Sequence, residues 1–436
     1  MRKRQNGFHA IKNAILARTD TFAGVEATLD YDALILGGGA AGFFAAIACA
    51  EAQPGRRVAI VERGKDTLQK VRISGGGRCN VTHAVWEPRE LVKYYPRGGK
   101  ALRGPFTRFC TGDTVEWFER RGVELKIEAD GRMFPKSNKS TSIMRALREA
   151  AERAGVVVWL SKNVQRIQAP TETQPHWQLT AGVDVFRAPR LLIATGSNTR
   201  VWSLIEQHGH TIVPPVPSLF TFNTKDTRLR DLSGLSMPTA KLRVMGTKLQ
   251  SDGPLLITHW GLSGPAVLKL SAWGARELQA IDYRFELRVN WLGRATDEIR
   301  DALRQQKTEL TKKNVQKTPL FGVPRRLWES LTNAATITPT LRWADLGKKA
   351  LNKLALELTD APFNIAGKST FKEEFVTAGG IELKEVDFKA FRSKKHDSLY
   401  FAGEVLDIDA VTGGFNFQAA WTGGYLAGRA MAEGEA

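Results

Sequence analysis

Three glycines in the N-terminal part of the chain have a spacing that can bind a dinucleotide. Gly37, Gly39 and Gly42 match the pattern G-x-G-x-x-G, with Ala40 and Ala41 at the variable positions. In such a loop the first glycine permits a tight turn, the second lets the backbone approach a pyrophosphate, and the third lets a helix pack on a strand. Free N–H groups at the helix N-terminus then face the phosphates. The segment therefore predicts a dinucleotide site rather than a purely structural turn.

An acidic residue stands where the adenosine ribose of such a ligand would bind. Glu62 follows Gly42 by 20 residues and ends a short apolar run that reads as the second strand. A carboxylate there accepts hydrogen bonds from ribose hydroxyls. It also disfavours a 2′-phosphate, because like charges would meet, although Arg63 weakens that argument slightly. FAD or NAD is the expected ligand.

A second glycine run has polar residues at its end. The segment Ser74-Gly75-Gly76-Gly77-Arg78-Cys79-Asn80 predicts a loop with accessible backbone N–H groups. Such loops cradle anions or lie against a flat ring, whereas the alternative is a flexible surface loop. Cys79 could act beside a flavin, but a lone cysteine is more often a small packing residue.

Two further segments have the composition of a chain that passes close to a cofactor. One is Ala194-Thr195-Gly196, which follows a buried strand, and the other spans residues 403–416. In the second, Asp407 can bond ribityl hydroxyls, and a helix that starts at the glycine pair can direct its dipole at the flavin. The contacts predicted from these segments are Ala194, Thr195, Gly196, Gly403, Glu404, Asp407, Gly413, Gly414, Phe415 and Asn416, and Val164 is included with them.

The elements that must position these residues follow a βαβ order. Strands are expected at 31–36, 57–61 and 191–194, helices at 40–52 and 141–154, and a last helix at 414–431. Composition changes at the proline-rich segment 214–217, after which short strands and then helical patterns follow. The predicted organisation is an extension at 1–29, a cofactor domain formed by 30–205 and 370–436, a β-rich insert at 206–290, and a helical insert at 291–369.

The composition sets limits on partners and location. The net charge of +18 favours polyanions, although a solvated basic surface is the simpler interpretation. Three cysteines without metal or disulfide spacing fit a reducing cytoplasm, and no metal site is expected. Residues 33–50 carry no charge, but the glycines at 37–39 argue against a membrane span. His208 and His210 are interpreted as surface residues.

Taken together, these motifs resemble the BaiN-type flavoproteins, also described as aminoacetone-oxidase-like FAD-binding enzymes. The specific segments are S-G-G-G-R-C-N at 74–80 and H-W-G-L-S-G-P at 259–265. The resemblance implies an α/β fold of the two-dinucleotide-binding-domain flavoprotein type, with a Rossmann-like FAD domain that holds an inserted β-barrel and a helical subdomain. It implies FAD at Gly37, Gly39, Gly42 and Glu62 for the adenosine end, and at 74–80, Asp407 and 414–416 for the ring end. Ser197 and Ala410 stand where glycine is common in the family.

The resulting functional hypothesis is an FAD-dependent oxidoreductase. Hydride would pass between a tightly bound flavin and a small organic substrate or NAD(P)H, which would bind transiently because no second complete fingerprint is present. His259 is the candidate proton donor or substrate contact, with a structural role in its turn as the alternative. A second hypothesis is a flavoprotein that binds or modifies RNA through a basic tract that includes Lys312, Lys313, Lys317, Arg325, Arg326, Lys348 and Lys349.

Overall fold

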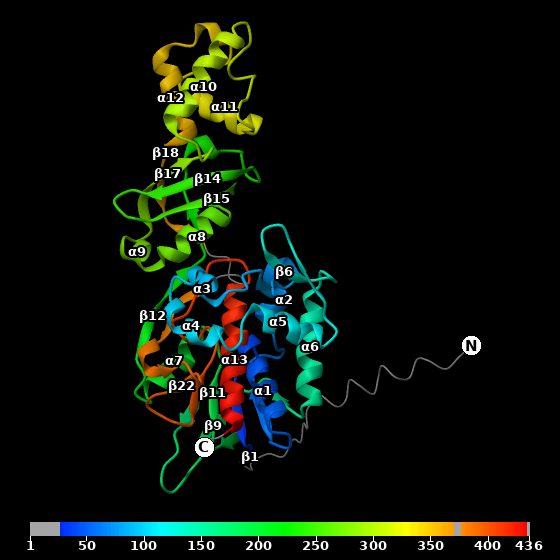
Figure 1. The fold of residues 1–436 in the computed structure, drawn as a ribbon. Coiled ribbons are helices and arrows are strands. Elements are labelled where there is room, and N and C mark those ends of the chain that lie inside the picture. The colour runs from blue at the N-terminus through cyan, green and yellow to red at the C-terminus, as the bar shows by residue number, and fades with distance from the viewer. Residues whose placement is uncertain (1–26, 370–375, 434–436) are drawn as a thin grey trace, which may run out of the picture. The chain divides into compact units, whose positions relative to one another are not determined.

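The computed structural model describes residues 27–369 and 376–433, which form two compact units (Figure 1). The first unit combines residues up to 215 with those from 379 onward, and residues 216–378 between them form the second. The sequence had placed these breaks after 205 and 369. Residues 27–30 form strand β1 (Ala27–Asp30), so the fold begins within the predicted extension, whose residues 1–26 lie outside the described part.

The first unit is built on a seven-stranded sheet in which five consecutive strands are parallel. Its order is β21-β22-β23-β11-β2-β3-β7, and the pairs from β23 to β7 are parallel. Strands β23, β11, β2 and β3 are buried and apolar, as a parallel sheet covered on both faces requires, whereas the edge strand β7 is partly exposed. The seven strands are β21 (Val386–Asp387), β22 (Arg392–Ser393), β23 (Leu399–Phe401), β11 (Leu191–Ile193), β2 (Ala33–Leu36), β3 (Val58–Val61) and β7 (Val157–Trp159).

Two small sheets and eight α-helices complete the described part of the first unit. The sheets are β1-β10-β9-β8 and β4-β6-β5, formed by β10 (Asp184–Ala188), β9 (Trp177–Ala181), β8 (Arg166–Gln168), β4 (Thr82–His83), β6 (Arg132–Pro135) and β5 (Leu125–Ile127). The helices are α1 (Ala40–Ala52), α2 (Gln69–Gly77), α3 (Pro88–Leu91), α4 (Gly99–Phe106), α5 (Thr111–Glu119), α6 (Ser140–Arg153), α7 (Thr199–Glu206) and α13 (Phe415–Glu433). None of the helices in the described ranges has the length and apolar character that a membrane crossing needs.

The second unit contains a seven-stranded sheet that curls until its edges meet. Its order is β18-β17-β14-β15-β16-β13-β19, and the edge strands β18 (Ala361–Ala366) and β19 (Lys368–Ser369) are separated by Gly367 alone. The N–H of Gly367 donates to the carbonyl of Tyr283, and its own carbonyl accepts from Asn223, at 3.0 and 2.9 Å. The other strands are β17 (Arg284–Asn290), β14 (Ser236–Val244), β15 (Gln250–Ile257), β16 (Gly261–Ser263) and β13 (Thr221–Asn223). The α/β fold with an inserted β-barrel is confirmed.

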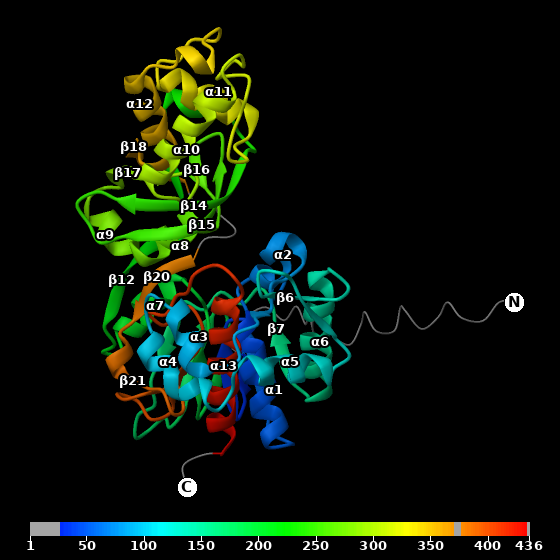
Figure 2. The same cartoon turned by 45° about the horizontal axis from the view of Figure 1, so that its top comes forward.

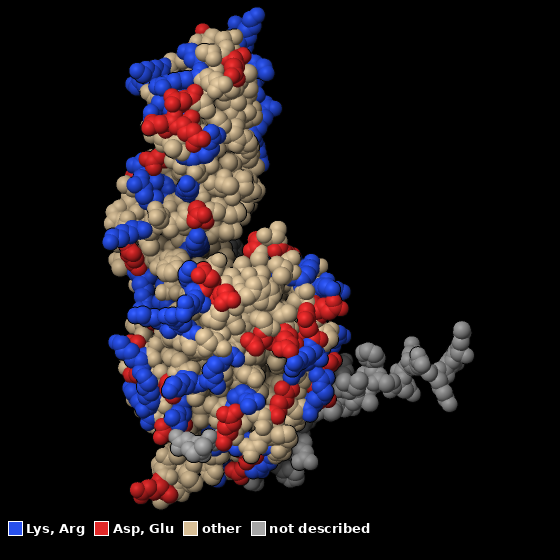
Figure 3. Space-filling view, viewed as in Figure 1, with Lys and Arg blue, Asp and Glu red and all other residues tan. Residues whose placement is uncertain are grey.

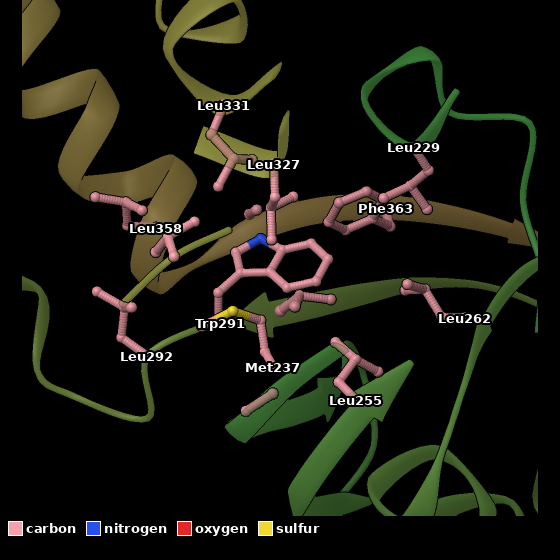
Figure 4. Close-up of a cluster of buried hydrophobic side chains, with 14 of the residues drawn as sticks. Leu229, Met237, Leu255, Leu262, Trp291, Leu292, Leu327, Leu331, Leu358 and Phe363 are labelled. Atoms are coloured by element: carbon pink, nitrogen blue, oxygen red, sulfur yellow. The ribbon is translucent and has the colours of Figure 1, made fainter. Parts of the chain in front are cut away.

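The helical part of the second unit packs against this barrel through a tryptophan-centred core. Trp291 follows β17 directly and is fully buried among Leu327, Leu331, Leu358 and Phe363 (Figure 4). Burial of large apolar side chains of this kind contributes roughly 1.5–3 kcal/mol for each residue. The helices are α8 (Pro265–Trp273), α9 (Ala275–Ala280), α10 (Thr296–Glu309), α11 (Arg325–Ala334) and α12 (Lys348–Thr359). Strands β12 (Ile212–Ser218) and β20 (Val376–Ile381), which connect the units along the chain, pair with each other.

The surface assignment of His210 is wrong, because its ring is 1% exposed just before β12. Nδ1 lies 3.0 Å from Oε2 of Glu385, and Nε2 lies 3.0 Å from Oγ of Ser393. Ser393 Oγ already accepts the N–H groups of Lys395 and His396, so its hydroxyl proton is directed at Nε2 of a neutral ring. Burial lowers the pKa of His210, and burial also lowers the pKa of the half-buried His208.

This arrangement predicts that folding stability declines in mild acid. The folded-state pKa of His210 lies below that of an unfolded histidine, so its contribution is complete above the unfolded value and is lost as pH falls below it. Each such histidine adds a slope of up to about 1.4 kcal/mol per pH unit. Urea unfolding from about pH 8 to about pH 5.5 should show this decline, and His210→Gln should be less stable at pH 8 but fall less steeply. Parallel curves for the two proteins would contradict the prediction.

Candidate functional site

The 37–42 loop connects β2 to the N-terminus of α1, as its spacing predicted. Gly37 has a φ of +114°, and a Cβ there would lie 2.5 Å from the carbonyl oxygen of Ala194. A Cβ on Gly42 would lie 2.0 Å from the carbonyl oxygen of Gly37. Gly39 is different, because a Cβ there would meet nothing within 4 Å. Packing thus requires the outer two glycines, whereas Gly39 faces open space.

The start of α1 leaves its positive end available to a ligand. Gly39 caps the helix without a side-chain hydrogen bond, and the first turn holds no acidic residue. The first N–H groups of a helix need external acceptors, and phosphate oxygens are suitable ones. The backbone at Ala40 and Ala41 can therefore hold a pyrophosphate above Gly39.

Glu62 lies at the end of β3 and holds the same loop. Oε2 accepts the N–H of Gly38 at 2.7 Å, and Oε1 accepts that of Gly64 at 2.6 Å. Each carboxylate oxygen has a second lone pair that a ribose hydroxyl can use. Arg63 is exposed and forms no ion pair in the described chain. Val164 is buried, and Lys162, two residues before it, donates its N–H to the Glu62 carbonyl.

The segment 74–80 differs from the plain loop that the sequence predicted. It includes the end of α2, which kinks at Ser74, Gly75 and Gly76. Gly75, Gly76 and Gly77 have φ angles of +58°, +67° and +82°, a left-handed conformation that glycine adopts without strain. A Cβ on Gly76 or Gly77 would meet nothing within 4 Å, so both present bare backbone to open space.

Arg78 and Cys79 anchor this segment. The Arg78 guanidinium lies 2.6 Å from Oε1 of Glu128 and stacks 3.9 Å above the centre of the Phe134 ring. Cys79 is fully buried, and burial raises the pKa of its thiol to about 12, partly opposed by a hydrogen bond with Ser74. The thiol therefore stays protonated near neutral pH, which favours the packing role over a thiolate redox role.

Two buried polar atoms in these segments have no partner among the described residues. They are Oδ1 of Asn80, at the end of the glycine run, and Oγ1 of Thr195, just after β11. Such atoms are rare in native proteins and call for an explanation. A ligand with hydroxyl and ring N–H groups would satisfy both, so the residues present suit FAD. Gly196 continues past Thr195 with a φ of +60°.

The C-terminal segment brings its residues to the start of α1. A Cβ on Gly403 would lie 3.0 Å from Cβ of Ala41, so the backbone of 403–407 passes close to the 37–42 loop. Glu404 is ion-paired with Lys70, and Asp407 is half-buried with its N–H donated to Ile381. Gly403 thus brings this segment to the 37–42 loop, and the Glu404 carboxylate lies beside Gly196.

The turn before α13 is closed by a side chain that the sequence had assigned to the cofactor. Asn416 Oδ1 accepts the N–H of Ala410 at 3.0 Å, and Nδ2 donates to the Ala410 carbonyl at 3.2 Å. The Asn416 amide therefore holds the 410–416 turn. A Cβ on Gly414 would lie 2.6 Å from the Thr82 carbonyl, and the buried ring of Phe415 stacks on Tyr94 at 4.3 Å.

Helices α1 and α13 lie side by side and run in the same direction (Figures 1 and 2). A Cβ on Gly424 would lie 2.5 Å from the carbonyl oxygen of Ala41, and one on Gly428 would lie 2.2 Å from that of Ala45. Contacts that advance by four residues on both helices require a parallel arrangement. Both positive helix ends therefore point to the same end of the first unit.

An ion pair that sequence reasoning missed holds the segment 403–416 through Asp409. Arg97 binds Asp409 through both carboxylate oxygens, and the Asp409 side chain is 0% exposed. The partners are 312 residues apart, so no local pattern could reveal the pair. Removing one partner of such a pair leaves an uncompensated buried charge, which costs about 3–5 kcal/mol.

The candidate catalytic histidine, His259, is not in the unit that contains these residues. His259 is exposed at the tip of the hairpin between β15 and β16, where Thr258 and Gly261 close the turn. It belongs to the second unit, whereas the predicted cofactor contacts all belong to the first. Its catalytic role stays a prediction. No cluster of metal-ligating side chains is present in residues 27–369 and 376–433.

Comparisons with known proteins identify the family of this chain. The family model described as the HI0933-like protein Rossmann domain matches residues 31–430. The chain is 29% identical over 404 residues to the ribosomal RNA dihydrouridine synthase of Escherichia coli, covering 90% of this chain and 96% of that relative. It is 27% identical over 410 residues to the 3-dehydro-bile acid delta(4,6)-reductase of Clostridium scindens, covering 92% and 98%.

Among solved structures, the 3-ketosteroid delta1-dehydrogenase of Sterolibacterium denitrificans matches with a TM-score of 0.49 and 12% identity, covering 93% of this chain and 99% of that one. The family match extends over nearly the whole chain and confirms the resemblance seen in the sequence motifs. This protein is an FAD-dependent oxidoreductase that belongs to the HI0933-like family.

Proposed function

We propose that the protein uses bound FAD to reduce a carbon–carbon double bond conjugated to a carbonyl group in a small organic substrate. The observation that carries the proposal is the open backbone at Gly39, where an added Cβ would meet no protein atom within 4 Å, together with the unpartnered buried polar atoms of Asn80 and Thr195. These features suit a large polar cofactor that completes the site. Hydride chemistry then needs positioning more than an acid–base triad.

Each residue has a role in this proposal. The backbone at Gly39, Ala40 and Ala41 holds the pyrophosphate, and Glu62 accepts the ribose hydroxyls. Asp407 would accept ribityl hydroxyls, and the open backbone of Gly76 and Gly77 would lie along the cofactor. The positive end of α13, reached through Gly413 and Gly414, would stabilise negative charge on the ring and so favour its reduction.

The names of two relatives support the substrate class. A 3-dehydro-bile acid with delta(4,6) unsaturation has a ketone conjugated to double bonds, and dihydrouridine is uridine with its C5=C6 bond reduced beside a carbonyl. Bound FAD would supply hydride to the carbon β to the carbonyl of such a substrate, and a proton would go to the α carbon. NAD(P)H is proposed as the reductant that restores the flavin.

A second candidate places that double bond in RNA. Relatives from Escherichia coli and Haemophilus influenzae are named ribosomal RNA dihydrouridine synthases, and this chain has a net charge of +18. A field of that sign attracts the phosphate backbone of RNA. The reaction at the flavin would be the same, with uracil in place of a free enone. The cytoplasmic location inferred from the cysteines suits either substrate.

A pair of glycine substitutions separates an effect on FAD binding from an effect on folding. Gly39→Ala adds a methyl group that meets no protein atom, so it should leave the melting temperature of the FAD-free protein unchanged. The methyl enters the space assigned to the pyrophosphate and should weaken FAD binding at least about tenfold, a loss near 1.4 kcal/mol. Gly42→Ala is the matched control and should destabilise the fold, because its Cβ would overlap the Gly37 carbonyl. Full FAD affinity in Gly39→Ala would place the pyrophosphate elsewhere.

The reaction itself is tested with the purified holoenzyme. The protein should be yellow and release FAD, and NADPH or NADH should bleach it without oxygen. A conjugated enone should then restore the oxidised absorbance, and its saturated counterpart should not. Restoration by a uridine-containing RNA alone would favour the second candidate. A bleached flavin that only oxygen reoxidises would overturn both.

A further inference from the structure

Two segments at the helical end of the second unit are joined into one surface. Backbone N–H groups of Val315 and Trp343 donate to the carbonyls of Leu341 and Lys313, at 3.0 Å each, and Asn314 forms a β-bridge with Arg342. Val315 and Trp343 are fully buried. Residues 311–318 and 341–349 are therefore held together on a packed core.

This surface has a large excess of positive charge. Its six cations are all exposed, and Asp345 is the only acidic residue within the two segments. None of the six forms an ion pair with any residue in the described part of the chain. We call this set the basic patch, and it consists of Lys312, Lys313, Lys317, Arg342, Lys348 and Lys349.

Neighbouring cations in the same helical part are neutralised locally. Arg294 and Arg325 pair with the carboxylates of Glu298 and Glu329 one helical turn away, at 2.6 and 2.8 Å, and Arg304 pairs with Asp301 at 2.8 Å. The basic tract predicted from the sequence therefore contains two kinds of residue. Arg325 forms a surface ion pair, whereas the patch lysines form none within the described chain. Like charges gathered without partners repel one another, so the fold itself gains nothing from the patch.

The N-terminus of α12 adds to this field. Lys348 and Lys349 begin the helix, Gly347 caps it without a side-chain hydrogen bond, and its first turn holds no acidic residue. Figure 3 shows Lys and Arg side chains over the part of the second unit that carries the helices labelled in Figure 1. The positive end of the α12 dipole therefore lies at the basic patch and adds to its positive potential.

We propose that the basic patch binds the phosphate backbone of RNA. The proposal rests on the second candidate function and assigns it a surface. Segments 311–318 and 341–349 expose no large apolar side chain. A membrane-binding surface would insert apolar side chains, and a protein interface would present an apolar or aromatic anchor. A dense set of unpaired lysines and arginines suits a regular array of phosphates.

Fluorescence anisotropy with a labelled ribosomal RNA fragment tests the proposal on the full-length holoenzyme. The triple variant K313Q/K348Q/K349Q should bind at least about tenfold more weakly at about 0.1 M salt, and the slope of log K against log salt should fall by about 2–3. The control R294Q/R304Q/R325Q removes the same formal charge from paired positions and should change binding less than about threefold. FAD content and melting temperature verify that both variants fold.

Equal losses in the two triple variants would overturn the proposal, because binding would then follow total charge and not the patch. Unchanged binding in the patch variant would overturn it as well. Tighter binding to anionic phospholipid vesicles than to RNA at the same salt would assign the patch to a membrane instead. A holoenzyme that reduces a free enone but binds no RNA would remove the patch assignment and leave the flavin reaction standing.

Discussion

The close contact between α1 and α13 is the constraint on which the candidate site depends. Gly424 and Gly428 lie so near the carbonyls of Ala41 and Ala45 that a side chain at either position would collide with the backbone. This contact makes the helices parallel and places their positive ends together. In the proposed function, the positive end of α1 would face the pyrophosphate and that of α13 the ring.

The glycines around the site divide into two groups by what surrounds them. Gly37, Gly42 and Gly414 lie against backbone atoms, so the protein requires them in order to pack. An added Cβ on Gly39, Gly76 or Gly77 would meet no protein atom within 4 Å, and the last two have the left-handed backbone that glycine adopts without strain. Open glycine backbone beside the N-terminus of α1 is accessible to a ligand that must approach the main chain.

Paired and unpaired cations occur in both units. In the first unit, Arg78 pairs with Glu128, Lys70 with Glu404 and Arg97 with Asp409, whereas Arg63 forms no ion pair in the described chain. In the helical part of the second unit, some cations are paired and those of the basic patch are not. Net charge therefore says little about where a polyanion binds, and the pairing state of each side chain says more.

Local features were determined by the sequence itself. The bounds of α1, the turn at 37–42 and the acidic residue at the end of β3 follow from glycine spacing and apolar runs, which act over a few residues. Tertiary structure decided the kink at Ser74, the burial of His210, the Arg97–Asp409 pair, the use of Asn416 to close its own turn and the division of the basic tract. The burial of His210 and the Arg97–Asp409 pair depend on partners that are distant in the sequence, because burial and long-range ion pairing are set by what packs nearby and no local pattern records them.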